Sequence, residues 1–470
     1  MNHLRKFYSA FYAWLSTQKG SRLFLIVVIA VLAFDSAKII RPESAFRSRS
    51  DFEDYYQASR RLNQGDDLYK TQAIQKIIDQ KDRINDINLE ELIRLFIESK
   101  EVGAYLYPPF FAFVLTPVHS LSYKTAAIIF QLVSLSLLAL FLFQLISFLS
   151  PGSDRYIAVS LPVLLYFSFL HDNAGNGNVG FIILALCGFG LLWSLDLGIV
   201  QRVSASRTWQ FCKQFFGGFL IGIASVIKII PIFLSGVLFA QRRYLALTGF
   251  VFGILFGVSL PAVSVGMTHN IQLHKDWYSF LVGSYQKSLV VRPYANNQTI
   301  SAGISKLLID GSDVKQNRFG LPLYSVGIDD LPKVTIAIRI INAALVLSLL
   351  SLLVAVAWRL PKLALQFDFT SLVSLTLLTS LVSSGVSWYH TYSLLLIPLA
   401  IRISKGPIES VTERIAYYTP ACLALFLAIL PIRFYDAFSL YSVFTWAVVA
   451  AVIAHHRQLW ADLSSSIQGV

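Results

Sequence analysis

The sequence predicts an all-α protein that crosses a membrane many times. Hydrophobic residues make up 55% of its 470 residues, charged residues make up 14%, and the mean hydropathy is +0.60. A soluble domain could not hide this much apolar surface in a core. Thr125–Leu149 and Tyr244–Thr268 contain no charged residue. Each is longer than the roughly 20 residues that cross the hydrocarbon, so both are expected to be transmembrane helices.

Ten further apolar stretches raise the predicted number of spans to about twelve, within one domain that occupies 1–470. They are Leu23–Ile40, Pro108–Leu121, Tyr156–Leu170, Gly180–Leu195, Phe215–Ala240, Val334–Trp358, Phe369–Val386, Tyr389–Ile401, Ile415–Ile432 and Phe438–Ala454. Leu23–Ile40 has a basic flank but no small-residue cleavage pattern behind it, so we expect an uncleaved first span. Several of the short stretches can be re-entrant instead.

Basic residues in the short connections predict the orientation, because Lys and Arg are retained on the cytoplasmic side. The basic segment 1–22 places the N-terminus in the cytoplasm, and alternation across twelve spans places the C-terminus there too. Two long segments, 41–106 and 269–333, then lie outside the cytoplasm. The connection Gln201–Lys213 is basic but also falls outside. We interpret it as an interfacial helix anchored by Trp209, unless one of the weak spans before it is misassigned.

Net charge and cysteine content narrow the class further. The net charge of +12 comes from basic residues dispersed among the membrane connections, which indicates anchoring to anionic lipids rather than nucleic-acid binding. Cys187, Cys212 and Cys422 are far apart and lie in or near apolar stretches. They predict neither a disulfide framework nor a zinc site.

The first outer segment contains a helix with clustered carboxylates. Ser50 followed three residues later by Glu53 is typical of a helix N-terminus, and Gly65 suits the left-handed position that follows a helix. We therefore expect a helix that starts at Asp51 and ends before Gly65. The partial positive charge of the helix N-terminus stabilises an ionised Asp51, which makes it a candidate general base. Asp54, one turn along the helix, is the rival.

The same cluster has two other interpretations. It can be an ordinary solvated connector, since acidic first turns are common. It can also gather a divalent cation, although no tight ligand set is evident and the chemistry does not require a cofactor. The carboxylates concerned are Asp51, Glu53, Asp54, Asp66 and Asp67.

The rest of the two outer segments carries weaker signals. Leu89–Ser99 predicts a second helix, and Pro293, Pro322 and Pro332 are expected to break up the second outer segment. Asn297–Thr299 matches a glycosylation sequon. Such a short pattern often arises by coincidence, and the asparagine can instead line a site.

Polar residues interrupt two apolar stretches, and such interruptions are costly enough to need a reason. Lys228 lies in mid-span, where Pro231 is expected to loosen the helix beside it. We interpret Lys228 as a binding group for an anionic headgroup, with a structural ion pair as the alternative. Trp388, Tyr389 and His390 border another span. An aromatic belt at the membrane interface explains the Trp and Tyr but not His390.

Two more motifs border apolar stretches. Tyr105–Pro109 carries two prolines, which suit the first turn of a transmembrane helix. His171–Asn178, with the sequence HDNAGNGN, places imidazole, carboxylate and amide groups between two short spans. It can hydrogen-bond a sugar or form a glycine-rich turn.

In their order along the chain, these motifs resemble glycosyltransferase family 87 of the GT-C superfamily. The resemblance rests on Asp-Phe-x-x-Tyr-Tyr-x-Ala at Asp51–Ala58, Gly-Asp-Asp-Leu-Tyr at Gly65–Tyr69, Tyr-Pro-Pro at Tyr107–Pro109, Asn-Gly-Asn at Asn176–Asn178, Lys-Ile-Ile-Pro at Lys228–Pro231, Asn-Gln-Thr at Asn297–Thr299 and Ser-Trp-Tyr-His at Ser387–His390. It extends over most of the chain. One departure is Gly175–Asn178, where families of this kind often have Gly-Gln-x-Asn.

The resemblance implies a GT-C glycosyltransferase fold and a mannosyltransferase-like enzyme that takes its sugar from a polyprenyl phosphate. It implies an active site outside the cytoplasm, with a catalytic aspartate in the first outer segment, where Asp51 matches the motif. The acceptor would be a lipid-linked or cell-envelope glycan. We expect a monomer in a bacterial plasma membrane, surrounded by membrane lipids and without a nucleic-acid partner.

On this interpretation the transfer inverts the sugar's configuration. Asp51 would take the proton from the acceptor hydroxyl, and Lys228 and His390 would stabilise the departing phosphate. Contacts to the sugar or the acceptor are expected from Tyr55, Asn178, Asn297, Gln298, Trp388 and Tyr389.

A transporter or flippase for a lipid or sugar is the alternative function, because an intramembrane lysine and proline-interrupted spans also fit a substrate pathway. Transporters commonly consist of two corresponding halves. The cluster Asp51–Tyr69 and the break Lys228–Pro231 each occur once in the sequence, which favours the enzyme. A noncatalytic scaffold gives no reason for the intramembrane lysine.

Overall fold

The computed structural model describes a helical protein. The residues described are 10–11, 13–40, 50–69, 105–149, 154–195, 207–279, 295–309, 319–327, 330–359 and 367–468. They form helices and no strand, which confirms the all-α prediction. The helix predicted over Leu89–Ser99 lies outside the described residues.

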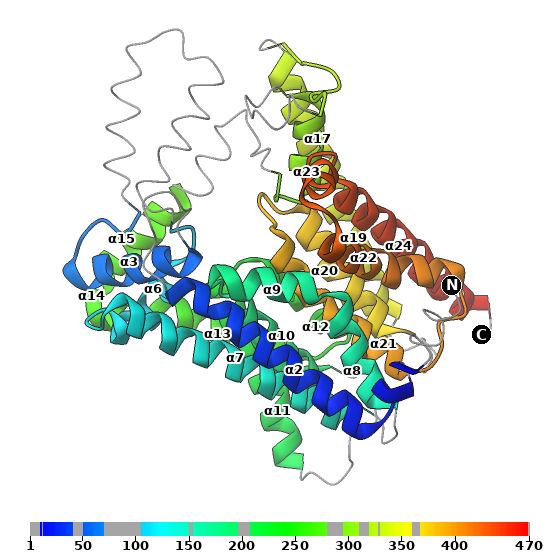
Figure 1. Ribbon diagram of the computed structural model, residues 1–470, viewed down its shortest axis with the longest axis horizontal. Helices are drawn as coiled ribbons and strands as arrows, with labels where there is room; N and C mark the ends of the chain where they lie inside the picture. Colours follow the sequence, from blue (N-terminus) through cyan, green and yellow to red (C-terminus); the bar gives the residue numbers. More distant parts are fainter. Residues whose placement is uncertain are drawn as a thin grey trace.

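The described helices of the first half of the chain run from α2 to α12 (Figure 1). They are α2 (Gln18–Ser36), η1 (Ala37–Ile40), α3 (Asp51–Gln64), α6 (Pro109–Val114), η3 (Thr116–Val118), α7 (Tyr123–Phe148), α8 (Asp154–Leu165), α9 (Phe167–Asn176), α10 (Gly180–Ser194), α11 (Arg207–Ile227), η4 (Ile230–Phe233) and α12 (Leu234–Ala240). The second half adds α13 (Tyr244–Ser259), α14 (Ala262–Val265), α15 (Met267–Tyr278), α17 (Ile300–Leu308), α19 (Leu331–Arg359), α20 (Phe369–Ser383), η8 (Tyr389–Leu395), α21 (Leu396–Ser404), α22 (Val411–Ile429), α23 (Ile432–Leu440) and α24 (Val443–Gln468).

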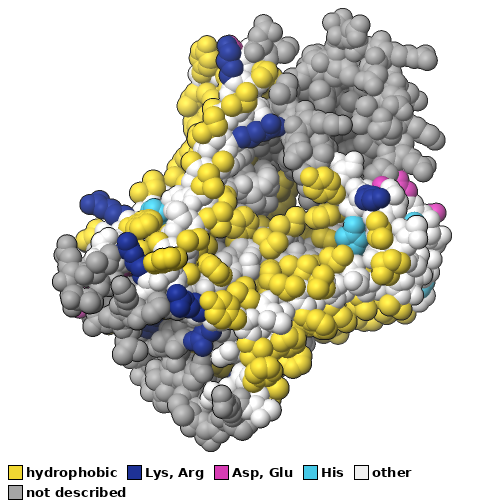
Figure 2. All heavy atoms as spheres, turned by 180° about the vertical axis from the view of Figure 1, so that it is seen from behind, with side chains coloured by type: hydrophobic (Ala, Val, Ile, Leu, Met, Phe, Trp, Pro, Cys, Tyr) yellow, Lys and Arg dark blue, Asp and Glu magenta, His cyan; other side chains and the backbone are white. Residues whose placement is uncertain are grey.

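Among the described residues, five helices are long and apolar enough to cross a membrane, or up to seven if each of two bent pairs is one span. The five are Gln18–Ile40, Tyr123–Phe148, Thr208–Ile227, Tyr244–Val265 and Leu331–Arg359. The bent pairs are α8 with α9 and α23 with α24. One face of the molecule carries a broad area of hydrophobic side chains with few charged ones among them (Figure 2). The structure supports a polytopic membrane protein without confirming twelve spans.

Two of the predicted segments differ in the structure. The span predicted over Pro108–Leu121 is wrong: α6 has six residues, about 9 Å at 1.5 Å per residue, which is too short to cross the hydrocarbon. Pro109 does occupy the first turn of this helix, as the motif predicts. The separate interfacial helix predicted over Gln201–Lys213 is also wrong where it is described. Trp209 lies near the start of α11, which continues to Ile227 as a candidate span.

Prolines break the apolar stretches at the places that matter for the site. The stretch predicted as one span over Tyr156–Leu170 is instead α8 and α9, which meet at a bend of 61° after Pro162. α11 ends at Ile227 because Pro231 has no amide hydrogen to bond the carbonyl oxygen of Ile227. The predicted break beside Lys228 is therefore confirmed.

The closest helix pair, α11 with α13, is packed through glycines. A Cβ atom on Gly222 would lie 2.3 Å from the carbonyl oxygen of Phe250, and one on Gly253 would lie 2.4 Å from that of Phe219. Only glycine allows the two backbones to approach this closely. α11 also packs against α10, which in turn packs against α7. Together these contacts hold the end of α11 in place.

The short helix η8 lies at the centre of the fold. All seven of its residues are buried, and it packs against α9, α10, α20 and α21. The stretch predicted over Tyr389–Ile401 is helical throughout, because η8 continues directly into α21 at Leu396. The packing of η8 places its polar residues against the end of α9.

Candidate active site

The carboxylate helix α3 has the predicted bounds. The Ser50 hydroxyl accepts a hydrogen bond of 3.2 Å from the Glu53 amide, and Gly65 follows the helix in the left-handed conformation with φ +74°. Asp51 is the first residue of the helix and is partly buried. Tyr55 and the residues on its face are buried, as the helical spacing predicts. One face of α3 is thus packed into the fold.

Asn178 joins the end of α9 to Asp51. Its side-chain nitrogen donates to Oδ2 of Asp51 over 2.7 Å, and its side-chain oxygen accepts from the Gly180 amide over 2.9 Å. The residue before it, Gly177, has φ +63°, and a Cβ atom there would lie 2.9 Å from Cβ of Phe52. Glycine is needed for both reasons. The close approach of α9 to α3 therefore fixes the Asp51 carboxylate.

Tyr107 completes this side of the cluster. It accepts a hydrogen bond of 3.0 Å from the hydroxyl of Tyr55 and also hydrogen-bonds Asn178. Burial, followed by the charge of Asp51, raises the pKa of the Tyr107 phenol, which therefore remains a hydrogen-bond donor. The sequence analysis did not assign Tyr107 to the site, although the Tyr-Pro-Pro motif was the available signal. Tyr55, which donates this hydrogen bond, is also buried, with 1% of its surface exposed.

Lys228 supplies a cation close to the same carboxylate. It follows the last residue of α11 and is partly buried, and its Nζ atom donates to Oγ1 of Thr391 over 3.0 Å. The charge of Asp51 acts on Lys228, so the two groups lie within electrostatic reach. Among the residues the structure describes, Lys228 has no salt bridge.

His390 lies one residue before Thr391 and is 3% exposed. Its Nδ1 atom is 3.1 Å from Oδ2 of Asp172, and its Nε2 atom is buried without a hydrogen-bond partner in the described part of the chain. Asp172 belongs to the segment His171–Asn178. The structure places His171–Asn176 in the last turns of α9, and a turn follows at Gly177.

The other predicted contact residues form a second network. Asn297 and Gln298 are fully buried. The side-chain oxygen of Asn297 accepts a hydrogen bond of 3.1 Å from the backbone amide of Ser387. Asn297 also forms an isolated backbone bridge with Trp388. The backbone amide of Gln298 donates to the Ser387 carbonyl over 2.8 Å. Tyr389 is buried with its ring stacked on another aromatic side chain. This network holds Asn297 and Gln298 against Ser387 and Trp388, just before η8.

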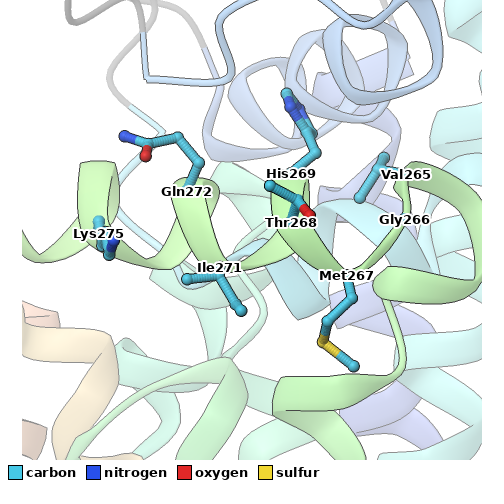
Figure 3. A pocket seen from close by; sticks show the side chains of 8 residues that line it. All are labelled: Val265, Gly266, Met267, Thr268, His269, Ile271, Gln272 and Lys275. Carbon is cyan, nitrogen blue, oxygen red and sulfur yellow. The ribbon is translucent and has the colours of Figure 1, made fainter.

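A surface pocket of about 600 Å³ lies on α14 and α15. Neither Asp51, Lys228 nor His390 lines this pocket. Figure 3 shows His269 and Gln272 on one side of α15 and Met267 and Ile271 on the other, so these polar and apolar side chains lie on opposite sides of the helix. Within the described ranges, no group of three or more His, Cys, Asp or Glu residues could hold a metal ion.

Comparison with known proteins identifies the family. The model of glycosyltransferase family 87 matches residues 105–384. The chain belongs to glycosyltransferase family 87. Of the cluster residues, Tyr107, Asn178 and Lys228 lie inside the matched range, and Asp51 and His390 lie outside it.

One curated relative is the polyprenol-phosphate-mannose-dependent alpha-(1-2)-phosphatidylinositol pentamannoside mannosyltransferase of Mycolicibacterium smegmatis. It is 25% identical over 311 residues, which cover 65% of this family 87 chain and 62% of the relative. The chain therefore matches less than two thirds of the relative's length. No solved structure matches the chain. The resemblance to family 87 seen in the sequence is confirmed.

Proposed function

We propose that this family 87 protein is a membrane glycosyltransferase that moves a hexose, most simply mannose, from a polyprenyl phosphate to a lipid-linked or cell-envelope glycan. The observation that carries the proposal is the placement of one carboxylate, Asp51, beside Asn178 and within electrostatic reach of Lys228. A base and a cation on one cluster are what a transfer from a sugar phosphate requires. The relative's dependence on polyprenol-phosphate-mannose supports the choice of donor.

In the proposed reaction the acceptor oxygen attacks the anomeric carbon as the bond from that carbon to the phosphate oxygen breaks. Asp51 accepts the proton of the acceptor hydroxyl. Asn178 holds one carboxylate oxygen, which orients the other for this task. Asp54 remains the rival base, and its charge also acts on Tyr107. The hydrogen bond from Asn178 favours Asp51.

The departing polyprenyl phosphate keeps the electrons of the broken bond and gains negative charge. Lys228 stabilises this charge, held in place by its hydrogen bond to Thr391. His390 can donate from Nε2 to a phosphate oxygen when it is protonated. The proposed active site faces outside the cytoplasm, as expected for a donor that is presented on that side.

The test is single-turnover transfer from a synthetic polyprenyl-phosphate mannose by purified protein, with Asp51→Asn compared against Asp54→Asn. Loss of the base should slow transfer by about 10²–10⁴-fold, and the Asp54 variant should lose much less. A dead Asp54 variant beside an active Asp51 variant would move the base one turn along α3. Absence of any glycosidic product from the wild-type protein, with translocation of the lipid instead, would favour the transporter.

A second measurement tests the donor. Lys228→Ala should weaken the use of the polyprenyl-phosphate sugar while the protein stays folded, and Lys228→Arg should keep part of it. Equal donor affinity in the alanine variant would contradict the phosphate-binding role. Competition between polyprenyl-phosphate mannose and the corresponding glucose donor then identifies the sugar.

A further inference from the structure

Two consecutive residues of α9 each pair with a residue on another helix. Asp172 lies 3.1 Å from Nδ1 of His390 on η8, and His171 places its Nδ1 atom 2.8 Å from Oδ2 of Asp35 on α2. The two pairs are buried from opposite sides. In the first pair the His390 side chain is 4% exposed and that of Asp172 is 43% exposed. In the second pair the His171 side chain is 47% exposed and that of Asp35 is 7% exposed. Only the first pair is joined to the cluster around Lys228.

We propose that Asp172 is a positioning residue that acts through His390. The proposal rests on the proposed function, in which His390 meets the donor phosphate. An acceptor beside Nδ1 keeps a proton on that nitrogen and fixes the ring plane, as second partners do for functional histidines. The ring then presents Nε2, which accepts a hydrogen bond when neutral and donates one when charged.

The unpartnered Nε2 atom supports this assignment. A buried polar atom without a hydrogen bond is destabilising by roughly 1–3 kcal/mol, so native proteins retain few of them without a reason. Nε2 of His390 is such an atom among the described residues. A ligand oxygen would provide the missing partner.

The carboxylate has two partners of its own, which distinguishes it from an amide. Oδ1 of Asp172 accepts from the side-chain nitrogen of Asn176 over 2.8 Å, while Oδ2 faces His390. An asparagine in its place has a single side-chain oxygen and cannot accept from both neighbours. Asp172→Asn therefore changes the pairing of His390 with almost no change in volume.

The neighbouring contacts place His390 beside the other proposed phosphate group. Thr391, the next residue of η8, accepts from Lys228. The charge of Asp172 also acts on Tyr389 and Tyr435, so these two phenols are titratable groups near the pair. Asp172 of α9 thus orients the imidazole of His390. The ammonium of Lys228 lies against the next residue, Thr391.

A double-mutant cycle tests whether Asp172 acts through His390. Asp172→Asn alone should lower kcat/KM about 10–100-fold, the usual range for second partners of functional groups. In a His390→Gln background the same change should have less than about a twofold further effect, because its target is gone. Equal losses in the two backgrounds would overturn the proposal. Asp35→Asn, which disturbs the pair formed by the neighbouring residue His171, is the matched control and should leave kcat/KM within about threefold.

A spectroscopic measurement makes the proposal independent of the enzyme assay. Protein labelled with ¹⁵N in its eight histidines reports which ring nitrogen is protonated, and the His390 signal is assigned by its loss in His390→Gln. In donor-free protein, at a pH where the His390 ring is neutral, the proton should reside on Nδ1 in the wild type and redistribute in Asp172→Leu. An unchanged tautomer in that variant would refute the positioning role. If the tautomer responds but no sugar is transferred, the proposed function fails and the positioning of the ring stands.

Discussion

Gly177 determines how closely the end of α9 approaches α3, and Gly177→Ala should separate the two. The residue has φ +63°, and an added Cβ would lie 2.9 Å from Cβ of Phe52 and 3.0 Å from Cδ1 of Ile39. The left-handed conformation costs a non-glycine residue about 1–2 kcal/mol. Relief of the overlap adds about 1–3 kcal/mol. The expected loss is therefore about 2–5 kcal/mol in the free energy of unfolding.

Gly65 provides the matched control. It also has a left-handed backbone, with φ +74°, but no atom lies within 4 Å of the position that an added Cβ would take. Gly65→Ala should lose only the conformational part, about 1–2 kcal/mol. The difference between the two variants isolates the contact between α9 and α3.

The assay is thermal inactivation of the two variants in detergent, followed by transfer activity at a temperature where both stay folded. Gly177→Ala should be the less stable variant. It should also lose activity while folded, because a shift of Gly177 moves Asn178 away from Asp51. Equal stability and activity in the two variants would show that the contact does not position the carboxylate.

Three further changes test other contacts. Gly249→Ala in α13 should lower the thermal midpoint, although alanine usually stabilises helices by about 1 kcal/mol, because its Cβ would lie 2.0 Å from the Phe215 carbonyl oxygen. Lys306→Met should lower the free energy of unfolding by roughly 3 kcal/mol in denaturant titration, because Lys306 donates to three backbone carbonyls. Burial opposes the ionisation of Asp368, but the Lys405 ammonium and nearby hydrogen bonds hold the pKa of its carboxyl below the ordinary value. A lowered pKa stabilises the fold above the unfolded pKa, so Asp368→Asn should lose about 1 kcal/mol at pH 7, and this difference should vanish as the pH falls through the folded pKa.

Local features of the site could be predicted because their causes act within a few residues. The bounds of α3 follow from a capping Ser50 and a left-handed Gly65, and the break at Lys228 follows from Pro231. The resemblance to the family likewise rested on short motifs. Each of these signals is complete within one turn or one break of a helix.

The spans were harder to predict, because hydropathy does not show whether an apolar stretch is straight. The stretch with Pro162 reads as one span but bends by 61°. The segment after Tyr107 reads as a span but forms a helix of six residues. The length of an apolar stretch shows how much of the chain avoids water. A segment that is buried inside a large membrane protein need not cross the bilayer.

Contacts between distant segments could not be predicted at all. Asp172 and His390 are 218 positions apart, and Asp51 and Asn178 are 127 apart. Their pairing depends on how α9 packs against α3 and η8, which no local pattern encodes. Asp172 and Tyr107 were missed for this reason, even though both lie in motifs that the sequence analysis singled out.

The clustered groups share one structural property: each lies within about one turn of the end of a helix. Asp51 begins α3, Asn178 follows the end of α9, Lys228 follows the end of α11, and Thr391 lies in the short helix η8. In a hydrocarbon environment, backbone groups that leave a helix must be satisfied inside the protein or face a polar cavity. Polar side chains and ligands can meet such groups only where several breaks converge. Where these four helix ends meet, a membrane protein can carry out sugar-phosphate chemistry without exposing polar backbone to lipid.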